Sequence, residues 1–425
     1  MQETTTPAPY HGALANRGAR AFGGPWGALA MMVFMPAVSV YLFLCVHARG
    51  GELAAPTTAL LAEFPKPTFR ACVYFTTWIV FQFALQLVLP GQRRVGLPQP
   101  DGRRLEYVLN GLPSLGLSLA ALGAVFFTGV LPPSAIWDEL GPLFTISVAF
   151  TLALSGFLYF YGRRSPYAES RTGDPIHDFF LGTALNPRVG AFDLKFFFES
   201  KIGMTTWIAV TLSMLAAQID RHGTVGASMA LVCAFQLLYV VDFYVFEDAM
   251  LSTWDINHEN FGYMLAFGFL VWMPFNFSLQ AEYLVDHDPA LSPLALVLLT
   301  VLNLGGYVVF RSSNLQKHRF RTDPGALIWG KKPDFIATAR GPKLLVSGFW
   351  GLSRHANYLG DFVMASAWCL ATGFSHLVPY FYVLYFAPLL IHRERRDHEA
   401  CREKYGADWD EYCRRVPYRI VPRLY

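Results

Sequence analysis

The chain has 425 residues, of which 53% are hydrophobic, 16% aromatic and only 15% charged, with a formal net charge of +3. Soluble domains carry about 25% charged residues, so this composition excludes an ordinary soluble protein. The small net charge does not indicate a nucleic-acid partner. Apolar runs of about 20 residues recur along the chain and predict an all-α, polytopic membrane protein.

The N-terminal residues 1–24 are polar and rich in Gly, Pro and Ala, which favours a disordered tail. The next apolar run is long enough to cross a membrane, so a cleaved signal peptide is not indicated. Residues 25–425 are expected to form a single transmembrane domain. We expect ten spans, at about 26–48, 71–90, 108–132, 142–161, 204–220, 225–247, 262–284, 291–310, 357–374 and 378–391.

The joins between these spans alternate in charge. Those near 133–141, 285–290 and 375–377 contain no Lys or Arg, whereas the long joins 162–203 and 311–356 are rich in both. Because basic loops stay on the cytoplasmic side, both termini are expected to be cytoplasmic. The basic joins and the charged C-terminal tail would form one cap there, suited to a phosphate-bearing ligand or anionic lipid.

The first long join contains TGDPIHDFFLGTALNPRVGAFDLK, from Thr172 to Lys195. Its Asn-Pro-Arg sequence is typical of a turn. Asp178, Arg188 and Asp193 are candidates for a polar network. We interpret this network as a structural staple of the join rather than as a catalytic group.

The segment YVVDFYVFEDAMLSTWD continues an apolar span yet carries acids. Carboxylates within a membrane span are costly, so they are candidates for function. Tyr239, one helical turn before the first of these acids, is a candidate buried proton donor. The alternative is that the span ends near Val245 and that the later acids are solvated. The acids are Asp242, Glu247, Asp248 and Asp255.

The second basic join contains SNLQKHRFRTDP, in which Lys317 and Arg321 are four residues apart. On a helix they share one face, and two cations on one face can clamp a phosphate. The alternative interpretation is that these charges only mark the cytoplasmic side of the membrane.

The tail after Leu390 is HRERRDHEACREKYGADWDEYCRRVPYRIVPRLY. Four of its side chains recur every four residues and form one stripe of a helix. An amphipathic helix in the membrane interface is the alternative explanation. The stripe consists of Arg393, Asp397, Cys401 and Tyr405, and Trp409 and Tyr412 continue its polar and aromatic character.

Several common motifs fail in this chain. The segment GALIWGKK lacks the Ser or Thr that a P-loop needs, and no GxGxxG follows a strand pattern, which argues against the usual dinucleotide-binding fold. The six cysteines include no CxxC pair, and His258-Glu259 has no second His four residues on. No metal site is therefore predicted.

TGDPIHDFFLGTALNPR and LLVSGFWGLSRHANYLGD, the latter with the charged tail, resemble the two signatures of the sterol reductase family. This family comprises sterol C14 reductases, 7-dehydrocholesterol reductases and the membrane domain of the lamin B receptor. The likeness runs from about residue 25 to the end. It implies NADPH-dependent reduction of a carbon–carbon double bond in a sterol that enters from the lipid bilayer. The C-terminal half, about 225–425, would carry both pockets, in a bacterial inner membrane or the endoplasmic reticulum.

The resemblance also implies which residues bind the cofactor. Two of these positions, and most of the tail stripe, coincide with residues whose spacing already places them on one helix face. Carried onto this chain, the family's NADPH positions are Lys317, Arg321, Leu345, Trp350, Asn357, Tyr358, Asp397, Cys401, Arg402, Glu403, Lys404, Tyr405 and Tyr412.

A ring alkene is not polarised by a carbonyl, so a hydride can add only after a proton has made carbon electrophilic. The resemblance and the local chemistry suggest Tyr239 as the proton donor. Asp397 would help to set the nicotinamide or share in the proton relay. Asp242, Glu247 and Asp248 would stabilise the cation.

Within the family, FEDAMLSTWDINHENFG resembles the acidic-acidic-Ala pattern of the C14 reductases more than the 7-dehydrocholesterol type. The expected target is therefore the Δ14 (C14=C15) bond, with Δ7 as the alternative. Phe246 stands where C14 reductases tend to have His, and Phe269 where an Asp is usual. Both changes make the pocket less polar.

Two alternatives come from other classes. The RHxxYxG element from Arg354 to Gly360 also resembles isoprenylcysteine carboxyl methyltransferases, which use S-adenosylmethionine. Those enzymes tend to have paired Glu where this chain has Arg395-Arg396-Asp397, and they lack the LNPR join. The second alternative is a non-enzymatic scaffold like the lamin B receptor. That protein, however, has a large N-terminal chromatin-binding region. Only about 25 polar residues precede the first span here.

Overall fold

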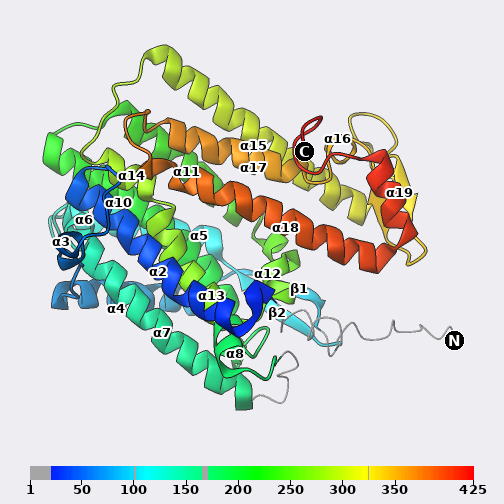
Figure 1. The fold of residues 1–425 in the computed structure, drawn as a ribbon, viewed down its shortest axis with the longest axis horizontal. Helices are drawn as coiled ribbons and strands as arrows, with labels where there is room; N and C mark the ends of the chain where they lie inside the picture. The colour runs from blue at the N-terminus through cyan, green and yellow to red at the C-terminus, as the bar shows by residue number, and fades with distance from the viewer. Residues whose placement is uncertain (1–20, 100–101, 165–170, 324) are drawn as a thin grey trace. The chain divides into compact units, whose positions relative to one another are not determined.

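The computed structural model describes residues 21–99, 102–164, 171–323 and 325–425 (Figure 1). Residues 1–20, most of the expected N-terminal tail, lie outside the described residues. Helices dominate the fold, and three short antiparallel pairs of strands accompany them. The chain divides into two compact units: residues 1–225 with 236–286, and residues 226–235 with 287–425. The helix α11 (Ala227–Val245) contributes to both units.

The first unit contains most of the helices and two of the strand pairs. Its helices are η1 (Ala21–Gly23), α2 (Gly24–Arg49), α3 (Thr58–Ala62), α4 (Phe69–Val88), α5 (Gly111–Phe127), α6 (Ala135–Asp138), α7 (Leu140–Arg164), α8 (Pro175–Leu181), α9 (Leu194–Phe196), η2 (Phe197–Met204), α10 (Thr205–His222), η3 (Glu247–Ser252), α12 (Trp254–His258), α13 (Tyr263–Phe267), η4 (Gly268–Asn276) and α14 (Leu279–Leu284). Its strands are β1 (Gln92–Pro98), β2 (Arg104–Leu109), β3 (Arg188–Val189) and β4 (Phe192–Asp193).

The second unit is built on three long helices and one strand pair. Its elements are α15 (Pro293–Thr322), β5 (Phe335–Ala337), β6 (Lys343–Leu345), α16 (Phe349–Leu352), α17 (Ala356–Leu370), η5 (Val378–Tyr380), α18 (Phe381–Tyr405) and α19 (Ala407–Arg415). Strands β5 and β6 pair antiparallel, with Phe335 opposite Leu345.

Within the described residues, seven helical segments are long and apolar enough to cross a membrane: Ala21–Arg49, Phe69–Val88, Leu140–Arg164, Leu194–His222, Ala227–Val245, Tyr263–Leu284 and Pro293–Thr322. The prediction of a polytopic helical membrane protein is confirmed. The other three expected spans correspond to α5, α17 and α18. The first two are shorter than the seven, and α18 runs directly into the charged tail.

One span begins ten residues earlier than its sequence suggested. We expected it at 204–220, but the helix starts at Leu194 and passes through the π-helix η2. Lys195, Glu199 and Lys201 look like loop residues in the sequence, yet all three are buried. Lys195 donates to three backbone carbonyls and Lys201 pairs with Glu247, contacts that sequence patterning cannot reveal.

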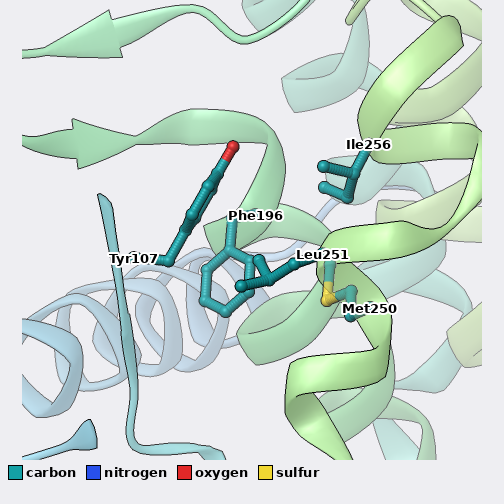
Figure 2. Packing of buried hydrophobic residues seen from close by; sticks show 5 residues of the cluster. All are labelled: Tyr107, Phe196, Met250, Leu251 and Ile256. Carbon is teal, nitrogen blue, oxygen red and sulfur yellow. The ribbon is translucent and has the colours of Figure 1, made fainter. Parts of the chain in front are cut away.

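A compact aromatic and aliphatic cluster holds the segment that follows α11 in place (Figure 2). Tyr107 of β2 and Phe196 of α9 pack there against Met250, Leu251 and Ile256. Burying each large apolar side chain contributes about 1.5–3 kcal/mol. The cluster therefore fixes the acidic segment against the strand pair β1–β2.

In the second unit, α17 packs against α15 and against α18 (Figure 1). The contact with α15 is close because glycines face each other there. A Cβ atom on Gly360 would lie 2.4 Å from the Phe310 amide nitrogen and 2.6 Å from the Gly306 carbonyl oxygen. Small residues allow this approach of backbones in membrane proteins. The contact fixes the first turns of α17, which carry the candidate cofactor residues.

Candidate cofactor and substrate sites

The C-terminal end of α15 presents Lys317 over an aromatic ring. The Lys317 Nζ lies 4.1 Å from the centroid of Trp350, a cation–π distance. The Trp350 indole Nε1 donates a hydrogen bond of 2.7 Å to the Ser313 carbonyl oxygen. The indole is therefore held by the same helix that carries the lysine, and the ammonium group has a defined position.

The loop before α16 is locked to α15 as well. The Phe349 amide donates to Gln316 Oε1 at 3.0 Å. Gly348 adopts a φ of +62°, and a Cβ there would lie 2.4 Å from the same oxygen. A side chain at Gly348 would push α16 away from α15. Trp350 thus keeps its place under Lys317.

Lys317 and Arg321 are both on α15, four residues apart, as the sequence predicted. In the described part of the chain, neither side chain has a carboxylate within ion-pair distance. Arg321 is exposed and Lys317 half-buried. Two cations on one helix face, neither in an ion pair, have the chemistry that can bind an anion.

Leu345 serves a packing role beside these two cations. It is buried with Trp350, and their cluster includes Phe320 and Ile328, with Phe335 packed against it. The pairing of β5 with β6 brings Phe335 opposite Leu345. The cluster therefore ties the strand pair to α15 and α16.

Asp397 is the centre of a second group of predicted residues. His355 Nε2 lies 3.5 Å from Asp397 Oδ2, and the Cys401 thiol lies 3.9 Å from the same oxygen. The His355 ring stacks on Tyr358 with 4.7 Å between ring centroids. The structure thus brings Asp397, Cys401 and Tyr358 together around an imidazole that the sequence analysis did not select.

Burial and positive neighbours set the protonation of this group. Burial lowers the pKa of His355 to about 3, and the charges of Lys317 and Arg354 act in the same direction. The imidazole is therefore neutral at physiological pH. Burial raises the pKa of Asp397, whereas Lys317 opposes that rise. Burial and the neighbouring Asp397 raise the pKa of the Cys401 thiol to about 12, so it stays protonated.

Arg354 joins the start of α17 to the C-terminal segment, and sequence reasoning did not include it among the site residues. Its Nη1 lies 3.0 Å from Cys413 Sγ and 3.2 Å from His398 Nδ1, and its Nη2 donates to the Pro417 carbonyl at 3.3 Å. Its backbone amide also donates to Tyr418 at 3.0 Å. Only its place beside His355 in the RHxxYxG element signalled a role.

The tail forms a packed end to this site. The Trp409 indole donates to His398 Nδ1 at 3.1 Å and stacks on Tyr412 at 5.0 Å. Cys401 and Tyr405 pack against the same cluster. Burial raises the pKa of Tyr412 above its ordinary value.

Three predicted cofactor residues lie on the exposed side of α18 instead. They are Arg402, Glu403 and Lys404. Arg402 lies 3.8 Å from Asp410, and the Lys404 Nζ lies 5.1 Å from the Tyr405 ring centroid. These three residues and Arg321 are the exposed members of the predicted cofactor set.

The proposed proton donor belongs to the first unit. Tyr239 is half-buried on α11, and its ring centroid lies 5.7 Å from that of Trp207. Asp242, one turn further on, is buried. Phe269 is buried in η4 with its ring 6.1 Å from Phe261, while Phe246 is half-buried after the end of α11. The two unusual phenylalanines thus occupy different surroundings.

Glu247 is enclosed by partners. It accepts hydrogen bonds from the Gly111 amide at 2.8 Å and the Ser200 hydroxyl at 3.0 Å, and its carboxylate lies 3.3 Å from Lys201 Nζ. Asp248 is exposed. The alternative that α11 ends at Val245 is right, and solvation holds for Asp248. The expectation that Glu247 is solvated is wrong: Glu247 is buried, and the buried Lys201 compensates its charge.

The join before this span is stapled as expected. Arg188 Nε donates to Asp193 Oδ2 at 3.0 Å, and Arg188 Nη2 donates to the Glu106 carbonyl at 2.9 Å. Asp178 does not share this contact. It accepts hydrogen bonds from the amide and hydroxyl of Thr172 at 2.7 and 2.8 Å. The three predicted residues therefore form two separate sets of contacts, one around Arg188 and Asp193 and one around Asp178.

These features define an integral membrane protein of the helical, multi-pass class, with two cations, Lys317 and Arg321, near the end of one long helix. The profile of the Ergosterol biosynthesis ERG4/ERG24 family matches residues 16–425. The chain belongs to this family, which confirms the resemblance found in its motifs.

Curated relatives resemble the chain over nearly its whole length. The Delta(14)-sterol reductase of Methylotuvimicrobium alcaliphilum is 44% identical over 409 residues, covering 95% of each chain. The Delta(14)-sterol reductase of Dictyostelium discoideum is 38% identical over 425 residues, with 96% of this chain and 92% of the relative covered. The Delta(14)-sterol reductase TM7SF2 of Mus musculus is 42% identical over 412 residues, with 95% and 97% covered.

Proposed function

We propose that the protein reduces the Δ14 double bond of a sterol, with NADPH as reductant, in sterol biosynthesis. The observation that carries this proposal is the full-length likeness to relatives named Delta(14)-sterol reductase, at 38–44% identity. The likeness spans both compact units, so it includes the candidate proton donor and the candidate cofactor residues alike. It favours a reductase over the methyltransferase alternative.

The residues of the second unit suit NADPH. Lys317 and Arg321 are cations without a carboxylate partner among the described residues, as a phosphate site requires. The Asn357 Oδ1 is buried and accepts no hydrogen bond within the described chain. We assign phosphate binding to the two cations, and contact with the nicotinamide end to Asn357 and Tyr358. When bound, NADPH supplies the hydride.

The chain itself supplies the proton and the electrostatic surroundings. We assign proton donation to the Tyr239 hydroxyl, which adds a proton to the alkene and leaves a carbocation in the sterol ring. Asp242 is the buried carboxylate closest in sequence to this tyrosine, and we assign it the stabilisation of that positive charge. Glu247 is already compensated by Lys201 and Asp248 is exposed, so they suit this role less well.

Asp397 is assigned to the cofactor side of the reaction. Its carboxyl lies beside the neutral His355, and the charge of Lys317 acts on it. In this position it would fix the nicotinamide or return a proton to the donor after each turnover. The alternating loop charges support a cytoplasmic location for this side, with both chain termini cytoplasmic. The sterol would enter from the bilayer.

A ligand-stability experiment tests the cofactor assignment and separates the reductase from a methyltransferase. A ligand that binds only the folded protein stabilises it by about 2.7 kcal/mol at 100 times its Kd. We expect NADPH to raise the Tm of the purified protein and S-adenosylmethionine to leave it unchanged. The opposite pattern would overturn the proposal.

A further inference from the structure

Two buried oxygens on α17 have no partner in the described chain. They are Asn357 Oδ1 and Asp361 Oδ1. Leaving a buried acceptor unsatisfied costs about 1–3 kcal/mol. The two residues are four apart on one helix, so their side chains project from one face. Two adjacent unsatisfied acceptors indicate a binding site for a ligand group that has two hydrogen-bond donors.

The position of Asp361 follows from its neighbours on α18. α17 and α18 are consecutive helices that pack against each other, and His355, just before α17, contacts Asp397 near the end of α18. The two helices are therefore antiparallel, and Asp361 lies one turn further from the charged tail than Asn357. Asn357 Oδ1 and Asp361 Oδ1 therefore lie on the side of the Asp397 group that faces away from the charged tail.

The two cations lie at the other end of this series. The charge of Lys317 acts on both His355 and Asp397. From the cytoplasmic end inward, the second unit thus presents cations, then Asp397, then Asn357 and finally Asp361. A dinucleotide has the same order, with phosphates at one end and a nicotinamide at the other. The nicotinamide carries a primary carboxamide, whose NH₂ offers two hydrogen-bond donors.

We propose that Asn357 Oδ1 and Asp361 Oδ1 accept the two N–H groups of the nicotinamide carboxamide. This inference rests on the proposed NADPH-dependent function and adds Asp361, which neither the sequence motifs nor the family resemblance assigned. Holding the carboxamide at two points fixes the rotation of the nicotinamide ring about its bond to the ribose. A sterol hydroxyl, with one donor, would satisfy only one of the two oxygens.

The test compares NADP⁺ with its 3-acetylpyridine analogue, in which a methyl group replaces the carboxamide NH₂. Binding of each to the purified full chain is measured by calorimetry. Two neutral hydrogen bonds predict that the wild type prefers NADP⁺ about 10-fold or more. Asp361→Ala should bind NADP⁺ about 10-fold more weakly and the analogue almost unchanged, so that the preference falls to about 2-fold or less.

Two controls separate recognition from general damage. Glu399 is an exposed carboxylate on α18, and Glu399→Gln should keep the full preference. The fragment 2′-phospho-ADP-ribose lacks the nicotinamide, so its affinity should be equal in the wild type and Asp361→Ala. If Asp361→Ala does not fold, Asp361→Leu fills a similar volume without an acceptor and should give the same loss of preference.

The outcomes are distinct. A folded Asp361 variant that retains the wild-type preference would refute the role of Asp361, as would a wild type that binds both dinucleotides equally. Equal weakening of the fragment and both dinucleotides would show a structural role only, and would also refute it. A wild type that binds neither dinucleotide would refute the NADPH-dependent function itself.

Discussion

His355 Nε2 lies 3.5 Å from Asp397 Oδ2, and the imidazole is neutral because burial and the nearby cations lower its pKa to about 3. The contact therefore joins a neutral imidazole to a carboxyl and is not an ion pair. The charge of Lys317 also acts on Asp397 and opposes the rise of its pKa, although the two groups form no ion pair.

This arrangement predicts an acid-sensitive stability. The pKa of His355 is about 3 in the folded protein and about 6.5 in an unfolded chain, so the unfolded state binds the extra proton. Its contribution is complete above pH 6.5 and is lost as the pH falls towards 3. At pH 5 the loss amounts to about 2 kcal/mol. The free energy of unfolding, measured by titration with denaturing detergent, should fall accordingly.

The variant His355→Gln isolates this effect, because glutamine does not titrate. Between pH 7 and pH 5 it should lose less stability than the wild type by about 2 kcal/mol. The raised pKa of Asp397 acts in the opposite direction, since a carboxyl that holds its proton better in the folded state stabilises the protein at low pH. Both proteins share that contribution. Identical pH slopes would contradict the neutral state of His355.

The position of Lys317 predicts that its removal weakens binding of NADPH, which carries the 2′-phosphate, more than binding of NADH, which lacks it. Lys317→Ala should raise KM for NADPH by about 10-fold or more, since a hydrogen bond to a charged group contributes about 1.5–3 kcal/mol. If Lys317 contacts the 2′-phosphate, KM for NADH should change little. Lys332→Ala removes an exposed lysine of the same join and serves as the control. An equal rise in KM for both cofactors would place Lys317 elsewhere on the dinucleotide.

The two tyrosines of α11 should behave differently. Tyr239→Phe should reduce turnover by about 10²–10⁴-fold, the usual contribution of a general acid, while NADPH binding stays intact. Tyr244 instead donates to the Ser200 carbonyl at 2.6 Å and lies 2.6 Å from the Thr205 hydroxyl. Tyr244→Phe should lower stability by about 1–3 kcal/mol and spare the turnover of the folded protein. Near-normal turnover in Tyr239→Phe would refute the assignment.

The buried pair of Lys201 and Glu247 predicts strong coupling. Lys201→Met leaves Glu247 as an uncompensated buried charge and should destabilise the protein by about 3–5 kcal/mol. Combining it with Glu247→Gln should recover most of that loss. The free energies of unfolding of the single and double variants form the test, and additive losses would show that the two groups act independently.

Spacing along helices made part of the site predictable. Lys317 and Arg321, and the stripe from Asp397 to Tyr405, were found because their period matches one helix face, and the structure places both on helices. Lys195 was missed because a buried lysine looks like a loop residue. Its Nζ is satisfied by carbonyls of Asp255, Ile256 and Glu259 at 2.7–3.0 Å, some 60 residues away in sequence.

Long-range partners account for the other differences. Arg354 lies in a motif that the sequence displayed, but its contacts are with Cys413 and Pro417 in the tail, and no periodicity links these positions. The expected count of ten spans relied on apolar windows alone. Within the described residues, seven helices meet the length and composition of a span, because α5 and α17 are short and α18 merges with the charged tail.

The central claim is that the chain reduces the Δ14 bond of a sterol with NADPH. Its most direct test is incubation of the purified protein with NADPH and a sterol 8,14-diene, beside a 5,7-diene, followed by mass spectrometry of the sterols. We predict that the 8,14-diene gains two mass units as its Δ14 bond is reduced, with equimolar oxidation of NADPH, and that the 5,7-diene is unchanged. Reduction of the 5,7-diene alone, or of neither sterol, would contradict the claim.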